Sequence, residues 1–238
     1  MRFSSNICTQ IMRNKREERC DVRMELKRTN LVIISAPSGC GKDTIIEKVC
    51  QRLDGIGVSI SCTTRKARKK KDGSYEQHGV DYFFIEKPEF EARIHDNGFL
   101  EYADVKGDLY GTPRAYVEKL ISDGNDVIIL NIENEGAAQI KATHPDAASI
   151  FILPPSAQEL RRRLVDRKSE TPEQIERRMA KSTEQMKTAY NYDYVVMNDD
   201  LETAVQDVVH IICTIRRRTM LHKELIDQIN ATFADEMA

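Results

Sequence analysis

The feature that most constrains this chain is a glycine-rich loop set between an apolar run and a helical stretch. The run Leu31–Ser35 is typical of a buried strand, and it leads directly into Ser35-Ala36-Pro37-Ser38-Gly39-Cys40-Gly41-Lys42-Asp43-Thr44. This segment approximates the phosphate-binding pattern G-x-x-x-x-G-K-[ST], with Ala36 in place of the first glycine. The two glycines permit backbone N–H groups to point inward, and the following helix adds the positive end of its dipole. We therefore predict that residues 38–44 bind the phosphates of a nucleotide.

The loop carries two side chains that indicate ATP together with a metal ion. Lys42 occupies the position from which a lysine pairs with the β- and γ-phosphates. Asp43 stands where a serine or threonine normally offers a hydroxyl to Mg²⁺. A carboxylate there is compatible with direct ligation of Mg²⁺, with partial compensation by Thr44, or with weakened metal binding. ATP with Mg²⁺ is the expected ligand, and Asp43 is the candidate metal residue.

Four further apolar runs predict the other strands of one sheet. They are Val58–Ser61, Val127–Asn131, Ser149–Leu153 and Tyr194–Met197. Most are rich in Val and Ile without polar alternation, which is typical of parallel strands that are buried on both faces. Helical stretches separate several of them, as βαβ crossovers require. We expect an α/β protein with a central five-stranded parallel sheet flanked by helices.

The chain is expected to divide into a P-loop core, one insertion and two tails. The segment before Pro113 is rich in aromatic residues and has a turn at Lys106-Gly107-Asp108, which predicts a small, strand-rich inserted domain. The N-terminal part is either a disordered extension or lies before a translation start at Met24. The expected limits are 1–28 for this extension, 29–62 and 113–220 for the core, 63–112 for the insertion, 161–178 for a mobile lid within the core, and 221–238 for a C-terminal helical tail.

Composition excludes several classes of function. The formal net charge is −2, from 36 basic and 38 acidic residues, so an overall attraction to nucleic acid has no support. The six cysteines form no C-x-x-C pair, and this pattern favours reduced thiols in the cytoplasm over a zinc site. No apolar run approaches the roughly 18 residues of a membrane span. We expect a cytoplasmic monomer or homodimer without nucleic-acid or membrane partners.

Four short motifs follow the loop in a fixed order. They are Ser61-Cys62-Thr63-Thr64-Arg65-Lys66-Ala67-Arg68, Gly79-Val80-Asp81-Tyr82-Phe83-Phe84, Phe99-Leu100-Glu101-Tyr102-Ala103 and Tyr110-Gly111-Thr112. Together with the loop they make the chain resemble the guanylate kinase family, from about Leu31 to Arg218. The resemblance implies an enzyme that transfers the γ-phosphoryl group of ATP to GMP, and also to dGMP, giving ADP and GDP.

The resemblance also implies a set of residues around the acceptor phosphate. Arg65 and Arg68 match the arginines that hold the GMP phosphate, and Tyr82 and Tyr110 match tyrosines that donate hydroxyls to it. A dianionic phosphate suits forked guanidinium donors combined with neutral ones. These four residues are therefore the expected phosphate contacts of GMP.

Base recognition is implied for a second set. Ser61 and Glu101 match the guanine readers, because guanine offers an O6 acceptor together with N1–H and N2–H donors. Adenine reverses this edge and would leave buried groups unpaired, at about 1–3 kcal/mol each. Thr112 matches a hydroxyl near the base, and it also precedes Pro113 as a possible helix cap. Glu133 keeps a carboxylate where an aspartate of the family helps to organise GMP and metal.

The resemblance extends to the residues expected to close over ATP. Arg163, Arg167 and Arg178 match the family's lid and the helix after it, where arginines neutralise charge on the transferring phosphoryl group. Asn198 matches a residue near the adenine. With Lys42, the three arginines are the expected catalytic residues.

One departure from the family pattern concerns charge near the phosphate loop. The strand Val127–Asn131 leads into Asn131-Ile132-Glu133-Asn134-Glu135-Gly136, where the family usually has Asp-x-Asp-x-Gln-Gly. Asn131 therefore lacks a charge, whereas Asp43 adds one. If Asp43 supplies charge to the metal, a neutral Asn131 nearby would relieve repulsion.

Three alternatives compete with the GMP kinase interpretation. A ribose 1,5-bisphosphate kinase can carry Gly-Lys-Asp in its loop, but Ser61 and Glu101, with the phosphate arginines and tyrosines, argue against it. A catalytically silent, guanylate kinase-like binding module typically has a degraded loop, whereas Lys42 and both inner glycines persist here. A nucleic-acid-binding ATPase would need positive charge and a binding module, and the sequence supplies neither.

Overall fold

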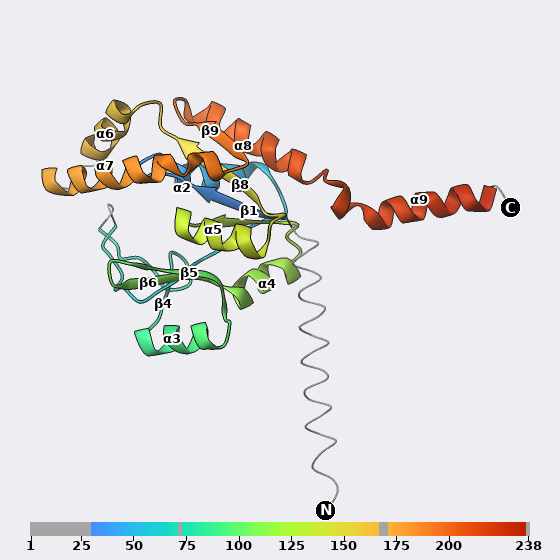
Figure 1. Ribbon diagram of the computed structural model, residues 1–238, viewed down its shortest axis with the longest axis horizontal. Coiled ribbons are helices and arrows are strands. Elements are labelled where there is room, and N and C mark those ends of the chain that lie inside the picture. Colours follow the sequence, from blue (N-terminus) through green and yellow to red (C-terminus); the bar gives the residue numbers. More distant parts are fainter. Residues whose placement is uncertain (1–29, 71–72, 167–170, 237–238) are drawn as a thin grey trace, which may run out of the picture.

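The computed structural model describes residues 30–70, 73–166 and 171–236, and a parallel sheet forms its centre (Figure 1). Five strands lie in the order β2-β7-β1-β8-β9, and every neighbouring pair runs parallel. Their bounds are β1 Asn30–Ser35, β2 Ile56–Val58, β7 Val127–Asn131, β8 Ala148–Leu153 and β9 Tyr194–Met197. Helices cover both faces, so the predicted α/β class with a five-stranded parallel sheet is confirmed.

The second strand of this sheet lies earlier in the sequence than expected. The expected run Val58–Ser61 contributes only its first residue, because the strand begins at Ile56 after a turn at Gly55, whose φ is 72°. The residues that follow leave the sheet and enter a second one at Cys62. An apolar run alone does not mark the point at which a strand changes sheets.

Two apolar cores separated by the sheet hold the main domain together. Helices α2 (Lys42–Arg52) and α8 (Leu201–Ile215) pack on one face, and α4 (Arg114–Ser122) and α5 (Asn134–Thr143) pack on the other. Alternate residues of β1 enter the two cores, and all six residues of the strand are buried. This double burial explains why the strands show no polar alternation.

The segment between β2 and α4 folds around a second, four-stranded sheet. Its strands have the order β4-β3-β6-β5 and span Cys62–Thr63 (β3), Phe83–Phe84 (β4), Phe99–Val105 (β5) and Asp108–Pro113 (β6). Helix α3 (Lys87–His95) packs on it, and the rings of Phe90 and Phe99 stack with their centroids 4.4 Å apart. This small sheet has a core of its own, with Cys62 buried beside the two rings.

Most of the segment 161–178 that was expected to be a lid lies in two helices. These are α6 (Ala157–Asp166) and α7 (Pro172–Lys187), and residues 167–170 between them are outside the described residues. Helix α7 begins where it does because the hydroxyl of Thr171 accepts the N–H of Gln174, whose side chain accepts the N–H of Thr171 in return. Leu160 and Leu164, on the apolar side of α6, are buried in the core that also contains α2 and α8.

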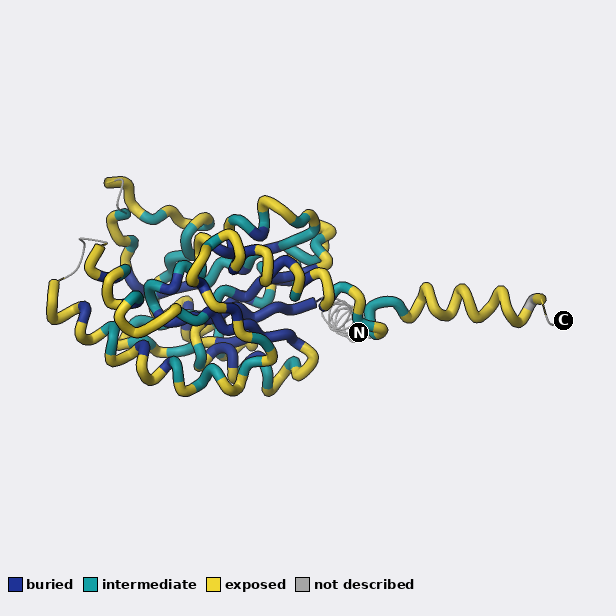
Figure 2. The backbone as a smooth tube through the Cα atoms, turned by 90° about the horizontal axis from the view of Figure 1, so that it is seen from above, coloured by how far each residue is buried: buried dark blue, intermediate teal, exposed yellow. Residues whose placement is uncertain are grey.

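The C-terminal region forms two helices that a short turn separates. Helix α8 ends at Ile215, a short 3-10 turn spans Thr219–Leu221, and α9 (Lys223–Glu236) projects away from the rest of the molecule (Figures 1 and 2). Helix α9 is exposed along its described length (Figure 2). In the described ranges, no helix has the length and apolar character needed to cross a membrane.

We predict that Ile128→Ala, in the middle of β7, lowers the free energy of unfolding by about 2–5 kcal/mol. Ile128 is fully buried between the sheet and helices α4 and α5, so the truncation leaves a cavity. Urea denaturation monitored by circular dichroism measures the change. Val195→Ala is the matched control, because Val195 is 57% exposed on β9, and its effect should stay within about 0.5 kcal/mol. Equal losses in both variants would contradict the assignment of β7 as a doubly buried strand.

Candidate active site

The phosphate loop joins the carboxyl end of β1 to the amino end of α2. Gly39 and Gly41 have φ values of 101° and 82°, a region that residues with a side chain rarely adopt. A Cβ at Gly41 would lie 2.6 Å from Nδ2 of Asn198, and one at Gly39 would lie 3.0 Å from a methyl carbon of Leu164. Both glycines are therefore required by backbone conformation and by the side chains that pack on the loop.

Lys42 starts α2 and lies among charges of both signs. Burial lowers the pKa of Lys42, whereas the negative charges of Asp43 and Glu133 oppose this shift. Glu133 itself is bound by Lys181 of α7, whose Nζ lies 2.6 Å from Oε2. The structure thus brings Lys42, Asp43 and Glu133 into one electrostatic environment at the loop.

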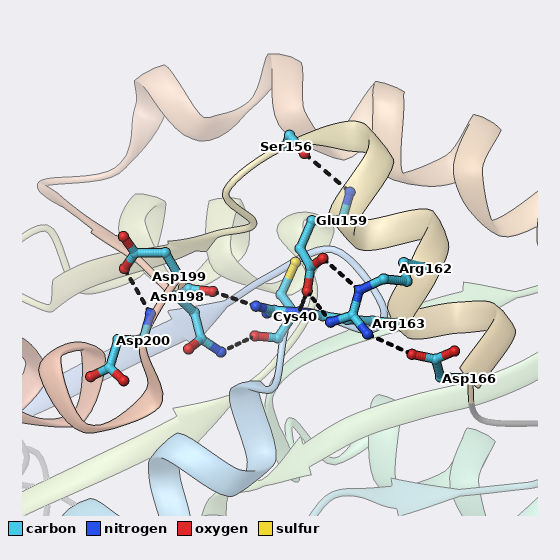
Figure 3. A network of polar contacts seen from close by, with 9 residues as sticks. All are labelled: Cys40, Ser156, Glu159, Arg162, Arg163, Asp166, Asn198, Asp199 and Asp200. Carbon is cyan, nitrogen blue, oxygen red and sulfur yellow. Dashed lines mark hydrogen bonds and ion pairs between the residues drawn. The ribbon is translucent and has the colours of Figure 1, made fainter.

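Asn198 braces the loop from its buried side (Figure 3). Its Nδ2 donates to the carbonyl of Cys40 (2.7 Å), and its own carbonyl accepts from Nη2 of Arg163 (2.9 Å). Arg163 also donates from Nε to Glu159 (2.8 Å), and hydrogen bonds from Arg162 and Arg163 lower the pKa of Glu159 to about 2. The loop, the turn after β9 and helix α6 are therefore joined by one chain of hydrogen bonds.

The three arginines that were expected in the lid have different surroundings. Nη1 of Arg178 on α7 lies 2.5 Å from the hydroxyl of Ser38, so this side chain reaches the phosphate loop. Arg163 is committed to the Asn198 carbonyl and to Glu159, as described above. Arg167 lies outside the described residues. Of these three, Arg178 is the arginine that the structure places directly on the loop.

The residues expected to hold the acceptor phosphate gather on the second sheet. Nε of Arg65 donates to the hydroxyl of Tyr110 (3.0 Å), and its guanidinium carbon lies 4.8 Å from the ring centroid of Tyr82. The two tyrosine rings meet edge to face, with centroids 6.1 Å apart. Arg68 has an exposed side chain beyond this cluster. Three of the four expected phosphate residues are therefore in direct contact with one another.

Glu76 is a member of this cluster that sequence reasoning missed. It receives two hydrogen bonds from Arg65, at 2.5 and 2.8 Å, and a third from the backbone N–H of Arg68 at 2.8 Å. The paired side chains are only 6% and 17% exposed. These bonds lower the pKa of Glu76 and raise that of Arg65. A buried arginine requires an anionic partner. The sequence signal that could have identified Glu76 is therefore an acidic residue within the basic stretch that follows Arg65.

The expected base readers lie in one row across the second sheet. Glu101 pairs with Thr112 in the register of β5 and β6, and the Thr112 hydroxyl donates to Oε1 of Glu101 (2.6 Å). Because Cys62 pairs with Gly111, the preceding residue, Ser61, extends the same row beside Thr112. Residues paired across antiparallel strands share a face of the sheet, and two strand spacings amount to about 10 Å. Ser61 and Glu101 therefore flank Thr112 on one face.

Thr112 does not cap the helix that follows it. It lies within β6, and no described side chain makes a capping hydrogen bond to the first turn of α4. The expected capping role is wrong because the hydroxyl is already engaged with the buried carboxylate of Glu101.

Glu101 also contacts the main domain. A Cβ at Gly136, in the first turn of α5, would lie 2.3 Å from Oε2 of Glu101, so only glycine permits this approach. Burial raises the pKa of Glu101, and the hydrogen bond from Thr112 opposes the shift. The amino end of a helix favours a nearby anion. The carboxylate is thus held between the second sheet and the first turn of α5.

Comparison with known proteins agrees with this arrangement. The family model described as "Guanylate kinase" matches residues 28–214. The chain belongs to the guanylate kinase family. It is 46% identical over 196 residues to a guanylate kinase of Thermus thermophilus, covering 82% of this chain and 85% of that protein. It is 39% identical over 211 residues to one of Coxiella burnetii, covering 89% and 100%.

A solved structure supports the same conclusion. The crystal structure of guanylate kinase from Anaplasma phagocytophilum matches with a TM-score of 0.66 and 30% identity, covering 84% of this chain and 94% of that one. This guanylate kinase family member is therefore an enzyme of the nucleoside monophosphate kinase class, with a P-loop that binds ATP. Burial raises the pKa of Tyr82 on the second sheet, and the positive charge of Arg65 opposes the shift.

The donor atoms at the loop fit a metal ion that ATP helps to hold. Among the described residues, no group of three or more His, Cys, Asp or Glu side chains forms a complete metal site. Mg²⁺ commonly binds proteins through one or two carboxylates and completes its shell with phosphate oxygens and water. The exposed carboxylate of Asp43, next to Lys42, suits this mode of binding.

We predict that Glu76→Gln destabilises the protein by about 1–3 kcal/mol at neutral pH, because Arg65 loses a charged partner in a largely buried place. The folded pKa of Glu76 is depressed below its ordinary value of 4.5, so this stabilisation exists above that value. It should fade as the pH falls through the lower folded pKa. Urea denaturation of both proteins at several pH values measures the difference.

Glu184→Gln serves as the control for this prediction, since Glu184 pairs with Lys187 while both side chains are about two-thirds exposed. Its effect should be small at every pH. A Glu76→Gln loss that stays constant down to pH 3 would show that the ion pair does not carry it.

Proposed function

We propose that this enzyme transfers the γ-phosphoryl group of ATP to GMP, and also to dGMP, giving ADP and GDP. The observation that carries the proposal is the buried Thr112–Glu101 hydrogen bond in a row with Ser61, on the same small sheet as the Arg65 cluster. A base reader and a phosphate clamp on one sheet match the two ends of a nucleoside monophosphate.

The base end of the site favours guanine. An ionised Glu101 accepts hydrogen bonds from N1–H and N2–H, and the Ser61 hydroxyl donates to O6. Because Thr112 donates to one oxygen of Glu101, the carboxylate is held with its second oxygen against α5. Adenine presents an amine and an unprotonated N1 to these groups, and it would leave buried partners unpaired.

The phosphate end supplies a fixed positive charge. Arg65 and Arg68 bind the dianionic phosphate of GMP, and the hydroxyls of Tyr82 and Tyr110 complete the shell. Glu133, which shares the environment of Lys42, orients GMP toward the loop. The raised pKa of Tyr82 supports this role, because burial keeps its hydroxyl protonated as a donor.

The phosphate loop and the lid carry the transfer itself. The N–H groups of Ser38, Gly39, Cys40, Gly41 and Thr44 cradle the phosphates of ATP, and Lys42 pairs with the β- and γ-phosphates. Asp43 would hold the Mg²⁺ that accompanies ATP, and the ion would supply charge neutralisation at the same phosphates. Arg163, Arg167 and Arg178 stabilise charge on the transferring group when the lid closes and excludes water. Asn198 supports the loop beside the adenine.

Coupled ADP release with four acceptors tests this function. GMP and dGMP should support turnover, whereas AMP and ribose 1,5-bisphosphate should give little. Turnover with the sugar alone would favour the ribose bisphosphate kinase alternative, and ATP binding without turnover would favour a silent binding module. We place the enzyme in the cytoplasm, consistent with the lack of a disulfide bond at Cys40, Cys50, Cys62 and Cys213 among the described residues.

We predict that the KM for GMP rises as the pH is lowered. The rise should begin at a higher pH than it would if the base reader were an exposed glutamate with an ordinary pKa. Burial raises the folded pKa of Glu101 above 4.5, and only its ionised form accepts both guanine donors. Glu101→Gln should raise this KM about 10–100-fold at pH 7 and remove the dependence. Steady-state kinetics between pH 5 and 8 measure both effects. Glu91→Gln on α3, which removes an exposed carboxylate, is the control. If the KM of Glu101→Gln depended on pH in the same way as that of Glu91→Gln, the proposed role of Glu101 would be refuted.

A further inference from the structure

We propose that Asp43 and Asn131 act as a matched pair, in which the amide of Asn131 holds the carboxylate of Asp43 as a direct ligand for the divalent cation of ATP. This inference rests on the proposed function. It assigns to Asn131 a positioning role at the cation. The carboxylate thereby takes the place of the hydroxyl that phosphate loops normally offer.

The contact that supports the pair joins two rigid elements. Nδ2 of Asn131 donates to Oδ1 of Asp43 at 2.9 Å. Asp43 lies in the first turn of α2, and Asn131 is the last residue of β7. Strands β1 and β7 are neighbours, with Ile34 opposite Asn131, so the donor and the loop are held by the same pair of strands. The geometry is therefore set by the sheet and needs no ligand to form.

The pair leaves a suitable oxygen atom for a hard cation. In the described part of the chain, Oδ2 of Asp43 has no hydrogen-bond partner. Carboxylate oxygens are protein ligands that Mg²⁺ and Mn²⁺ accept. Asp43 is exposed beside the loop, where phosphate oxygens of ATP would supply further ligands. One carboxylate, held in place by the amide of Asn131, therefore suffices on the protein side.

Asn131 also keeps Asp43 separate from the neighbouring lysine. The charge of Asp43 acts on the pKa of Lys42, yet the described contacts of Asp43 contain the amide of Asn131 and no ion pair with Lys42. A carboxylate at position 131 would place two negative charges in a 2.9 Å contact, which disfavours their joint ionisation. An amide holds the carboxylate without adding charge, and this leaves Asp43 for the cation and Lys42 for the phosphates.

Binding of Mn²⁺ to the enzyme with a non-hydrolysable ATP analogue tests the pair, and electron paramagnetic resonance measures it without any acceptor. We expect Asp43→Ala and Asp43→Asn to weaken Mn²⁺ binding about 10–100-fold, and Asn131→Ala to weaken it about tenfold. The double variant Asp43→Ala/Asn131→Ala should bind no more weakly than Asp43→Ala alone, because Asn131 acts through Asp43. Glu47→Ala, which removes an exposed carboxylate one turn along α2, is the matched control and should bind as the parent does.

Three results would overturn the proposal. Unchanged Mn²⁺ binding in Asp43→Ala would show that Asp43 is not a ligand, and additive losses in the double variant would show that Asn131 does not act through Asp43. A loss in Asp43→Ala that Glu47→Ala reproduces would show that the effect comes from general surface charge. Circular dichroism melting confirms that each variant is folded. The Mn²⁺ binding experiment contains no GMP, so its result does not depend on the proposed GMP kinase activity. A failure of that activity would appear only in the separate turnover assay.

Discussion

The candidate site depends on the parallel direction of the central strands, which brings their carboxyl ends to one edge. The phosphate loop leaves this edge after β1, Asn131 ends β7 there, and Asn198 follows β9. Each of these residues then bonds to the loop or its helix: Asn131 to Asp43, and Asn198 to the Cys40 carbonyl. An antiparallel neighbour would send its carboxyl end to the opposite edge. The parallel direction of the strands therefore brings together residues that are far apart in the chain.

The second sheet adds a separate binding surface and is tied to the core through that surface. Glu101, the candidate base reader, reaches the first turn of α5, where Gly136 leaves space for it. In its proposed role as base reader, Glu101 would link base recognition to the position of the small sheet, because it also contacts the main domain.

Much of the fold could be predicted because strands buried on both faces leave continuous apolar runs. The run for β7 has the bounds that were expected, and β1 differs by one residue. The phosphate loop could also be predicted, because the residues that define it are adjacent in the sequence. The point at which the chain leaves β2 for the second sheet could not be predicted, because it depends on pairing with distant strands. The pairing of Asn198 with Cys40 spans 158 positions, and the partner of Arg65 is one glutamate near several cations, so neither leaves a local pattern.

The Arg65 cluster has a consequence for the entropy of binding. Its guanidinium is already held by Glu76, by the Tyr110 hydroxyl and by the carbonyl of Lys66. Ordering a long, flexible side chain on association costs about 0.5–1.5 kcal/mol. Here folding has already removed that freedom, so an incoming anion meets a rigid donor. Affinity at this position then reflects direct attraction, with little loss of side-chain motion to offset it.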